Sequence, residues 1–163
     1  EIEPHPCLTL RAGRFPRDLH FEPASLSAVH AANVFHFLTP RQLAYGLRTI
    51  ARWLAPQGKL FVQAATPYQA PLAEFIPEYE RRVAAGVGWP GWVEKIGHFS
   101  SHRKLGQMPA SLHLLDDVIL ARAARDAGLE VERSELYRST AQSPSLHLDG
   151  REHVLLIARR PDY

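Results

Sequence analysis

The fold is decided by residues 25–66, which read SLSAVHAANVFHFLTPRQLAYGLRTIARWLAPQGKLFVQAAT. Residues 26–32 form a short and mostly apolar run, which is typical of a strand covered on both faces. Residues 60–65 form a second run of the same kind. A helical pattern lies between the two runs, so this stretch predicts a βαβ unit with parallel strands and a right-handed crossover.

The predicted helix has clear start and stop signals. Thr39 offers a hydroxyl N-cap, and Pro40 is preorganised for the first helical turn. Pro56 and Gly58 end the helical pattern. The apolar stripe, at spacings of four and three residues, consists of Leu43, Leu47, Ile50 and Leu54. The arginines on the other side, which we interpret as a solvated face, are Arg41, Arg48 and Arg52.

Residues 25–66 resemble the fourth strand, the following helix and the fifth strand of class I S-adenosylmethionine-dependent methyltransferases. The sharpest element is the turn at residues 54–58, LAPQG, which is similar to the L-x-P-G-G turn of that family. Gln57 replaces the first glycine of the turn, and Ser27 stands where the family often has aspartate. The glycine-rich cofactor loop of the family has no counterpart here, because the glycines at residues 86–91 follow no predicted strand and open no helix.

The flanking segments continue the resemblance in order. Residues 8–12 resemble the third strand of the family, and residues 129–137 and 152–160 resemble the sixth and seventh strands. A loop with serine, proline and glycine joins the last two, which predicts an antiparallel hairpin. The resemblance therefore implies an α/β fold, a partial Rossmann-like methyltransferase sheet that is mostly parallel and has an antiparallel C-terminal hairpin.

Composition fits one compact unit with a small-molecule substrate. The chain has 163 residues, of which 45% are hydrophobic, so we expect residues 1–163 to form a single partial methyltransferase domain. A net charge of +2 does not favour a nucleic-acid partner. Cys7 is the only cysteine, which fits a reducing compartment, and no apolar run is long enough to span a bilayer. We therefore expect a cytoplasmic protein without a membrane partner.

The start of the chain is unusual for a translation product. It begins at Glu1, and its only methionine is Met108. We expect a missing N-terminal portion, through truncation, cleavage or disorder. Half a parallel sheet exposes an apolar edge, so a further strand or a homo-oligomer would cover that edge. We also expect that residues 1–163 alone do not bind S-adenosylmethionine measurably.

The resemblance implies two groups of cofactor contacts. The turn after the third strand lies beside the adenine in this family, and the segment after the fourth strand lies beside the methionine and the sulfonium. The corresponding residues here are Gly13, Arg14 and Phe15, then Ala32, Asn33 and Val34. Open α/β sheets bind ligands outside the carboxyl ends of their strands, which supports this location independently. Phe15 either stacks on the purine or belongs to the core.

His36 is a weak candidate for a catalytic base. The imidazole of histidine titrates near neutral pH, and the resemblance places His36 on the substrate side of the fourth strand. The alternative is a histidine that caps a helix or packs in the core.

The insertion at residues 67–111 follows the fifth strand, where added segments commonly form a lid over the substrate. We expect a short charged helix at residues 74–85. The substrate candidates in this insertion are Tyr68, Trp89 and Trp92. The two tryptophans belong to a rigid Gly-Trp-Pro-Gly-Trp turn and would either clamp a flat substrate or pack the lid onto the sheet.

His98 and His102 have the i, i+4 spacing of a helical metal pair. No glutamate follows His98 as in zinc proteases, and no third ligand is evident, so we expect no metal.

The resemblance implies methyl transfer from S-adenosylmethionine to a small-molecule acceptor in the complete protein. Two alternatives remain open. The first is a non-catalytic interaction module that keeps the fold. The second is a nucleotide-binding α/β protein, whose last strand would run parallel to its neighbours.

Overall fold

The main layer of the molecule is a four-stranded sheet. The computed structural model describes residues 7–99, 110–141 and 143–162. The strands, in their order across the sheet, are β1 (Leu26–Ala32), β2 (Leu54–Ala65), β6 (His153–Arg159) and β5 (Glu130–Tyr137). Strands β1 and β2 are parallel, and β6 is antiparallel to both β2 and β5. Three strands therefore share one direction, which confirms the predicted mostly parallel sheet with an antiparallel C-terminal hairpin.

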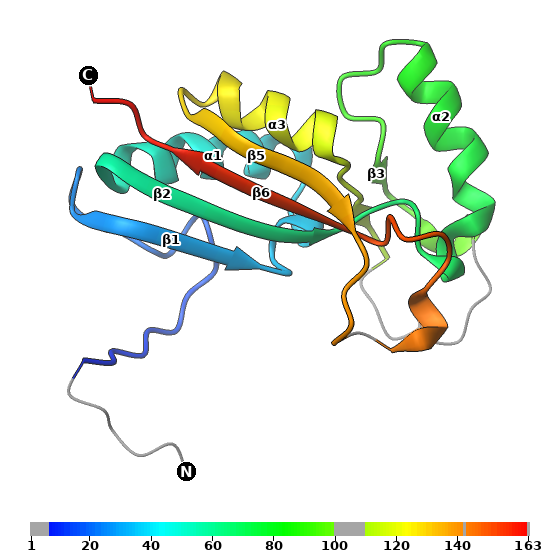
Figure 1. The fold of residues 1–163 in the computed structure, drawn as a ribbon, viewed down its shortest axis with the longest axis horizontal. Helices are drawn as coiled ribbons and strands as arrows, with labels where there is room; N and C mark the ends of the chain where they lie inside the picture. The colour runs from blue at the N-terminus through cyan, green and yellow to red at the C-terminus, as the bar shows by residue number, and fades with distance from the viewer. Residues whose placement is uncertain (1–6, 100–109, 142, 163) are drawn as a thin grey trace.

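Two helices, α1 (Pro40–Trp53) and α3 (Asp117–Asp126), cover one face of this sheet (Figure 1). The predicted start of α1 is confirmed. The Thr39 hydroxyl accepts a hydrogen bond from the Gln42 backbone N–H, and the Gln42 side-chain oxygen accepts one from the Thr39 N–H. This reciprocal pair is a capping box, which satisfies two backbone donors at the helix start.

The hydrophobic core lies between the sheet and the two helices. Alternate residues of β2 point into it, and each pairs with a buried residue of β6. The pairs are Leu60 with Ala158, Val62 with Leu156 and Ala64 with Val154. The intervening residues, such as Phe61 and Ile157, lie on the opposite face and are only half-buried. No helix of the described residues covers that face (Figure 1).

The predicted third strand is wrong. Residues 8–12 form no strand, and the side chains of Leu8 and Leu10 are 50% and 73% exposed. In a doubly wound sheet two strands lie between the third strand and the fourth. The described residues supply no strand at those intervening positions, so residues 8–12 have no neighbour with which to pair, and β1 has one unpaired edge.

Strand β2 begins earlier than predicted, because it includes the turn at residues 54–58. Gln57 in that turn has a φ angle of 63°, in the left-handed region that glycine occupies at little cost. Its N–H donates to the Arg160 carbonyl at 3.0 Å, and the Arg160 N–H donates to the Gly58 carbonyl at 2.9 Å. The position at which this chain departs from the family turn is therefore one that favours glycine.

The insertion forms a small layer beyond the end of the sheet where β1, β2 and β5 terminate (Figure 1). Its elements are η2 (Ala70–Phe75), α2 (Ile76–Ala84), β3 (Trp92–Val93) and η3 (Ile96–His98), and β4 (Leu112–His113) follows directly after it. Strands β3 and β4 pair antiparallel, and α2 confirms the predicted short helix. These elements bury a second hydrophobic cluster, the insertion cluster, of Tyr68, Leu72, Phe75, Tyr79, Val93, Ile96, Leu112 and Leu114. None of the helices in the described part of the chain is long and apolar enough to cross a membrane.

Candidate active site

The candidate site begins where β1 ends. Asn33 has a φ angle of 55°, which turns the chain sharply from the strand into η1 (Phe35–Phe37). Its N–H donates to the Gln63 carbonyl at 2.8 Å, so the turn is held against β2. Ala32 and Asn33 are exposed, and Val34 is 37% exposed. The three residues expected near the methionine of the cofactor therefore form one open surface at the carboxyl end of β1.

His36 is buried beneath this surface. Its Nδ1 accepts a hydrogen bond from the Ala65 N–H at 3.4 Å, which joins η1 to the end of β2. Burial, with a smaller effect of nearby His153, lowers the pKa of His36 to about 4. The ring is therefore neutral at pH 7, and because Nδ1 is an acceptor, its proton lies on Nε2. This geometry favours the alternative of a structural histidine, and the role of a base stays a prediction.

The segment after β2 is tied to the loop before β6. The buried Thr66 hydroxyl donates to the Arg151 carbonyl at 2.5 Å and accepts from the Tyr68 N–H at 3.2 Å. The Arg151 guanidinium lies 3.7 Å from the centre of the Tyr68 ring, a cation–π contact. Tyr68 is only 8% exposed and belongs to the insertion cluster. Its predicted contact with substrate remains a prediction.

Both predicted tryptophans of the insertion pack on one histidine. The Trp89 and Trp92 rings lie edge-on to the His113 ring, with centroids 5.0 and 5.9 Å away. His113 is fully buried, and its Nδ1 lies 3.1 Å from the Leu38 carbonyl oxygen, just after η1. Both tryptophans are half-buried. This arrangement favours packing of the insertion onto the sheet, while a role in substrate contact stays a prediction.

The turn between the two tryptophans depends on a glycine. A Cβ atom at Gly91 would lie 1.8 Å from the Leu114 carbonyl oxygen, and the Gly91 carbonyl accepts from the Leu114 N–H at 2.8 Å. Only a residue without a side chain permits this backbone approach. The Gly-Trp-Pro-Gly-Trp run therefore contributes a close backbone contact with Leu114 as well as two aromatic rings.

Asp116 joins the insertion to the sheet layer. One carboxylate oxygen caps α3 by accepting from the Ile119 N–H at 2.7 Å. The other oxygen accepts from the buried Tyr79 hydroxyl of α2. Burial and this hydrogen bond both raise the pKa of Tyr79, so the hydroxyl keeps its proton and remains a donor.

Sequence reasoning missed Glu152, a buried carboxylate just before β6. One of its oxygens accepts from the N–H groups of Leu148, Asp149 and Gly150 at 2.7, 2.9 and 2.8 Å. Burial alone would raise its pKa, but these amides and the Arg138 guanidinium outweigh it and lower the pKa to about 2. The Asp-Gly pair just before Glu152 was the available sequence signal for a tight turn.

The predicted adenine turn lies close to the loop after β1. The Phe15 ring packs against Phe35 and Trp53, at centroid distances of 6.2 and 6.3 Å, so Phe15 contributes to the core. Gly13 and Arg14 remain exposed. Since Phe35 directly follows Val34, the structure brings the two predicted groups of cofactor residues together. Their contact with the cofactor stays a prediction.

The predicted histidine pair falls partly outside the described residues. His98 ends η3, whereas His102 lies in the segment that the structure does not describe. Across residues 7–99, 110–141 and 143–162, no group of three His, Cys, Asp or Glu side chains is arranged to hold a metal ion.

Comparison with solved structures identifies the fold. A methyltransferase of Methanosarcina mazei is 12% identical, with a TM-score of 0.62 over 90% of this chain and 64% of that one. One from Mesorhizobium loti is 21% identical, with a TM-score of 0.55 over 88% and 65%. The [4+2]-cyclase SpnF is 15% identical, with a TM-score of 0.52 over 90% and 53%. No protein-family model and no curated protein sequence matches the chain.

The chain therefore has the fold of class I S-adenosylmethionine-dependent methyltransferases. It spans less than two thirds of the length of each of these three structures.

Proposed function

We propose that the complete protein transfers the methyl group of S-adenosylmethionine to a small-molecule acceptor. The observation that carries this proposal is the placement of β6 between β2 and β5, antiparallel to both. A doubly wound nucleotide-binding sheet keeps these strands parallel, so the antiparallel β6 counts against the nucleotide-binding alternative.

The end of β1 would hold the methionine part of the cofactor. Ala32 and Val34 offer apolar surface there, and the exposed Asn33 side chain can both donate and accept hydrogen bonds. The bound cofactor supplies a methyl group that its sulfonium already activates. This chain supplies one wall of the site, which is why we expect residues 1–163 alone to bind the cofactor too weakly to measure.

The insertion would align the acceptor and exclude water. It lies beyond the carboxyl ends of β1 and β2 (Figure 1). The half-buried Trp89 and Trp92 give it aromatic surface, and Tyr68 lies buried beneath. His113 and His36 hold this layer and the loop after β1 in a fixed relation to β2. Positioning and exclusion of water are the main demands of a reaction whose methyl group is already activated.

Calorimetry and a methyl-transfer assay test the proposal. The complete protein should bind S-adenosylmethionine with micromolar affinity and should transfer tritiated methyl groups to compounds in a small-molecule extract. Residues 1–163 alone should show neither. Tight binding by residues 1–163 would contradict the partial site, and failure of the complete protein to bind would favour a non-catalytic interaction module.

A pair of substitutions tests the location of the site. Ala32→Phe places a large ring on the exposed end of β1 and should weaken cofactor binding by the complete protein at least about ten-fold. Ala28→Phe is the matched control, because Ala28 is also exposed and lies on the same face of β1, four residues from the carboxyl end. Equal losses in the two variants would contradict the assigned location.

A further inference from the structure

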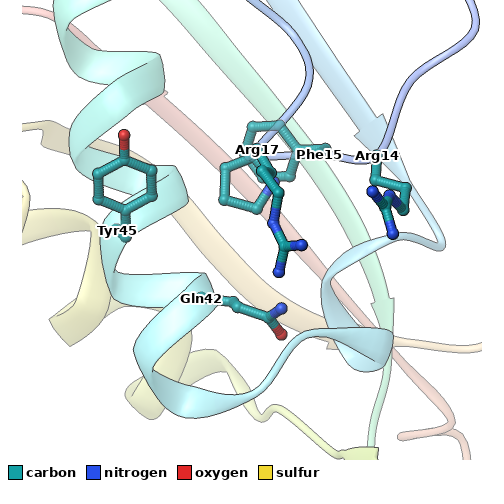
Figure 2. A pocket seen from close by; sticks show the side chains of 6 residues that line it. Arg14, Phe15, Arg17, Gln42 and Tyr45 are labelled. Carbon is teal, nitrogen blue, oxygen red and sulfur yellow. The ribbon is translucent and has the colours of Figure 1, made fainter.

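A cavity lined by arginines lies on the outer side of α1, away from the sheet. It measures about 360 Å³ and is lined by Arg14, Phe15, Pro16, Arg17, Gln42 and Tyr45 (Figure 2). A second hollow of about 360 Å³ is lined by Arg41, Gln42, Tyr45 and Arg48. The two hollows share Gln42 and Tyr45 and therefore adjoin. We call Arg17, Arg41, Gln42, Tyr45 and Arg48 the α1 pocket.

The positive charge of the α1 pocket is only partly neutralised within the described structure. Asp18 forms an ion pair with Arg14 at 3.0 Å and also interacts electrostatically with Arg17. Arg41 and Arg48 form no ion pair with a carboxylate among the described residues, and the sequence of α1 contains neither aspartate nor glutamate. This excess of guanidinium groups favours an anionic ligand.

The polar groups of the α1 pocket are almost all hydrogen-bond donors. The Gln42 side-chain oxygen already accepts from the Thr39 N–H at 2.9 Å, so its NH₂ group is the part left for a ligand. Figure 2 shows the Gln42 amide and the Arg17 guanidinium extending toward the same space. A ligand that satisfies such a lining must carry several acceptor oxygens, as a phosphate does.

Gly46 of α1 allows Phe15 to pack closely against the helix beside the α1 pocket. A Cβ atom at Gly46 would lie 2.7 Å from the Cε1 and Cζ atoms of Phe15, so a side chain there would displace the ring. Glycine in the middle of a helix is destabilising, which makes this close contact the physical benefit of Gly46. Because Phe15 is anchored in this way, Arg17 is held opposite Gln42 and Tyr45.

Tyr45 adds an aromatic surface between the arginines. Its side chain is 53% exposed, and it lies between Arg41 and Arg48 on one side of α1. An exposed aromatic ring beside arginines is the arrangement on which nucleobases stack in single-strand binding proteins. The two hollows have the size of a small-ligand pocket, and the net charge of +2 does not favour a polynucleotide.

From these observations, we propose that the α1 pocket binds a nucleoside monophosphate, with the phosphate between the arginines and the base on Tyr45. The α1 pocket adjoins Arg14 and Phe15, which we expect beside the adenine of the cofactor, but does not include Ala32–Val34. The inference does not depend on methyl transfer.

Calorimetric titration of this chain at low salt tests the proposal, with adenosine 5′-monophosphate as the probe. The nucleotide should bind at least about ten times more tightly than adenosine or inorganic phosphate, because only the nucleotide engages both the ring and the arginines. Arg41→Gln and Arg48→Gln should each weaken binding about ten-fold, and Tyr45→Leu about five-fold.

Arg52→Gln is the matched control. Arg52 lies on the same helix but does not line the α1 pocket, so binding should stay within about two-fold of the unchanged protein. Circular dichroism should show the same melting temperature for all four variants, since all four side chains are exposed.

Three results would each overturn the proposal. The first is equal weakening by Arg52→Gln and Arg48→Gln, which would indicate non-specific attraction. The second is binding of a single-stranded oligonucleotide without binding of the mononucleotide. The third is displacement of the nucleotide by S-adenosylmethionine in the complete protein, which would merge the two sites while leaving the proposed methyl transfer intact.

Discussion

The sheet core and the insertion cluster bury their side chains by different means. The sheet core is mostly aliphatic, and its residues recur every second position on β2 and every three or four positions on α1, as with Leu60 and Leu47. The insertion cluster is rich in aromatic residues and is joined to α3 by the bond between Tyr79 and Asp116. Short-range pattern therefore builds the first region, and contacts between distant residues build the second.

The largest effect should come from a cavity in the sheet core. Leu60 is fully buried, so Leu60→Ala should lower the free energy of unfolding by about 2–5 kcal/mol in urea denaturation. Leu72→Ala in the insertion cluster is the matched change, and it should expose the insertion to protease before the sheet unfolds. Simultaneous loss of both regions in Leu72→Ala would show that they form one cooperative unit.

Breaking the link between the regions should have the next largest effect. Asp116→Ala removes the α3 cap and leaves the Tyr79 hydroxyl buried without an acceptor, which should cost about 2–4 kcal/mol. Asp116→Asn keeps one acceptor oxygen and should cost less. Urea denaturation measures the loss, and equal costs for the two variants would contradict the importance of these hydrogen bonds.

Acid should weaken both regions through buried histidines. Burial lowers the pKa of His36 in the sheet layer and of His113 in β4, beside the insertion, to about 4, against 6.5 in the unfolded chain. The unfolded state therefore binds more protons between pH 6.5 and pH 4, so this stability is complete above pH 6.5 and is lost as the pH falls through that window. Each histidine should contribute a loss of about 2 kcal/mol between pH 7 and pH 5.

Urea denaturation of His36→Gln and His113→Gln at both pH values separates the two contributions. Each variant should show a smaller loss on acidification than the unchanged chain. A histidine ring that titrates near pH 6.5 in the folded chain by NMR would contradict its assigned burial.

The smallest effect should be a gain in the sheet region. Gln57→Gly removes the cost of the left-handed backbone at φ 63° and should raise the free energy of unfolding by about 1 kcal/mol. The variant also loses the hydrogen bond from Arg159 to the Gln57 side chain, and this loss reduces the gain. Gln63→Gly is the control, because Gln63 lies within regular β2, where glycine should destabilise.

Local signals were enough to predict much of the sheet layer. Thr39 and Pro40 fixed the start of α1, and the spacing of Leu43 and Leu47 defined its buried side. Residues 8–12 are also mostly apolar but form no strand. A strand forms only where a neighbouring strand is available for pairing, and composition does not reveal that neighbour.

The candidate site could be predicted only in part. The position of Asn33 followed from the end of a predicted strand, but its φ of 55° and its bond to Gln63 did not. The packing of two tryptophans against His113 depends on residues distant in the sequence, and the hydrogen bonds of the buried Glu152 carboxylate depend on residues in a loop. No periodic pattern encodes such contacts, so the sequence offered no direct signal for them.

The Glu152 carboxylate has a consequence for how the C-terminal hairpin forms. Residues 138–152 must be closed into a loop before β5 and β6 can pair. The three amides that Glu152 binds lie within four residues of it, so residues 148–152 can form a compact turn before any strand contact exists. The stretch of chain that remains to be closed is then about five residues shorter, which lowers the entropic cost of closure by a few tenths of a kcal/mol. The buried Glu152 carboxylate thus favours the pairing of β5 with β6, because it shortens the loop that must close between them.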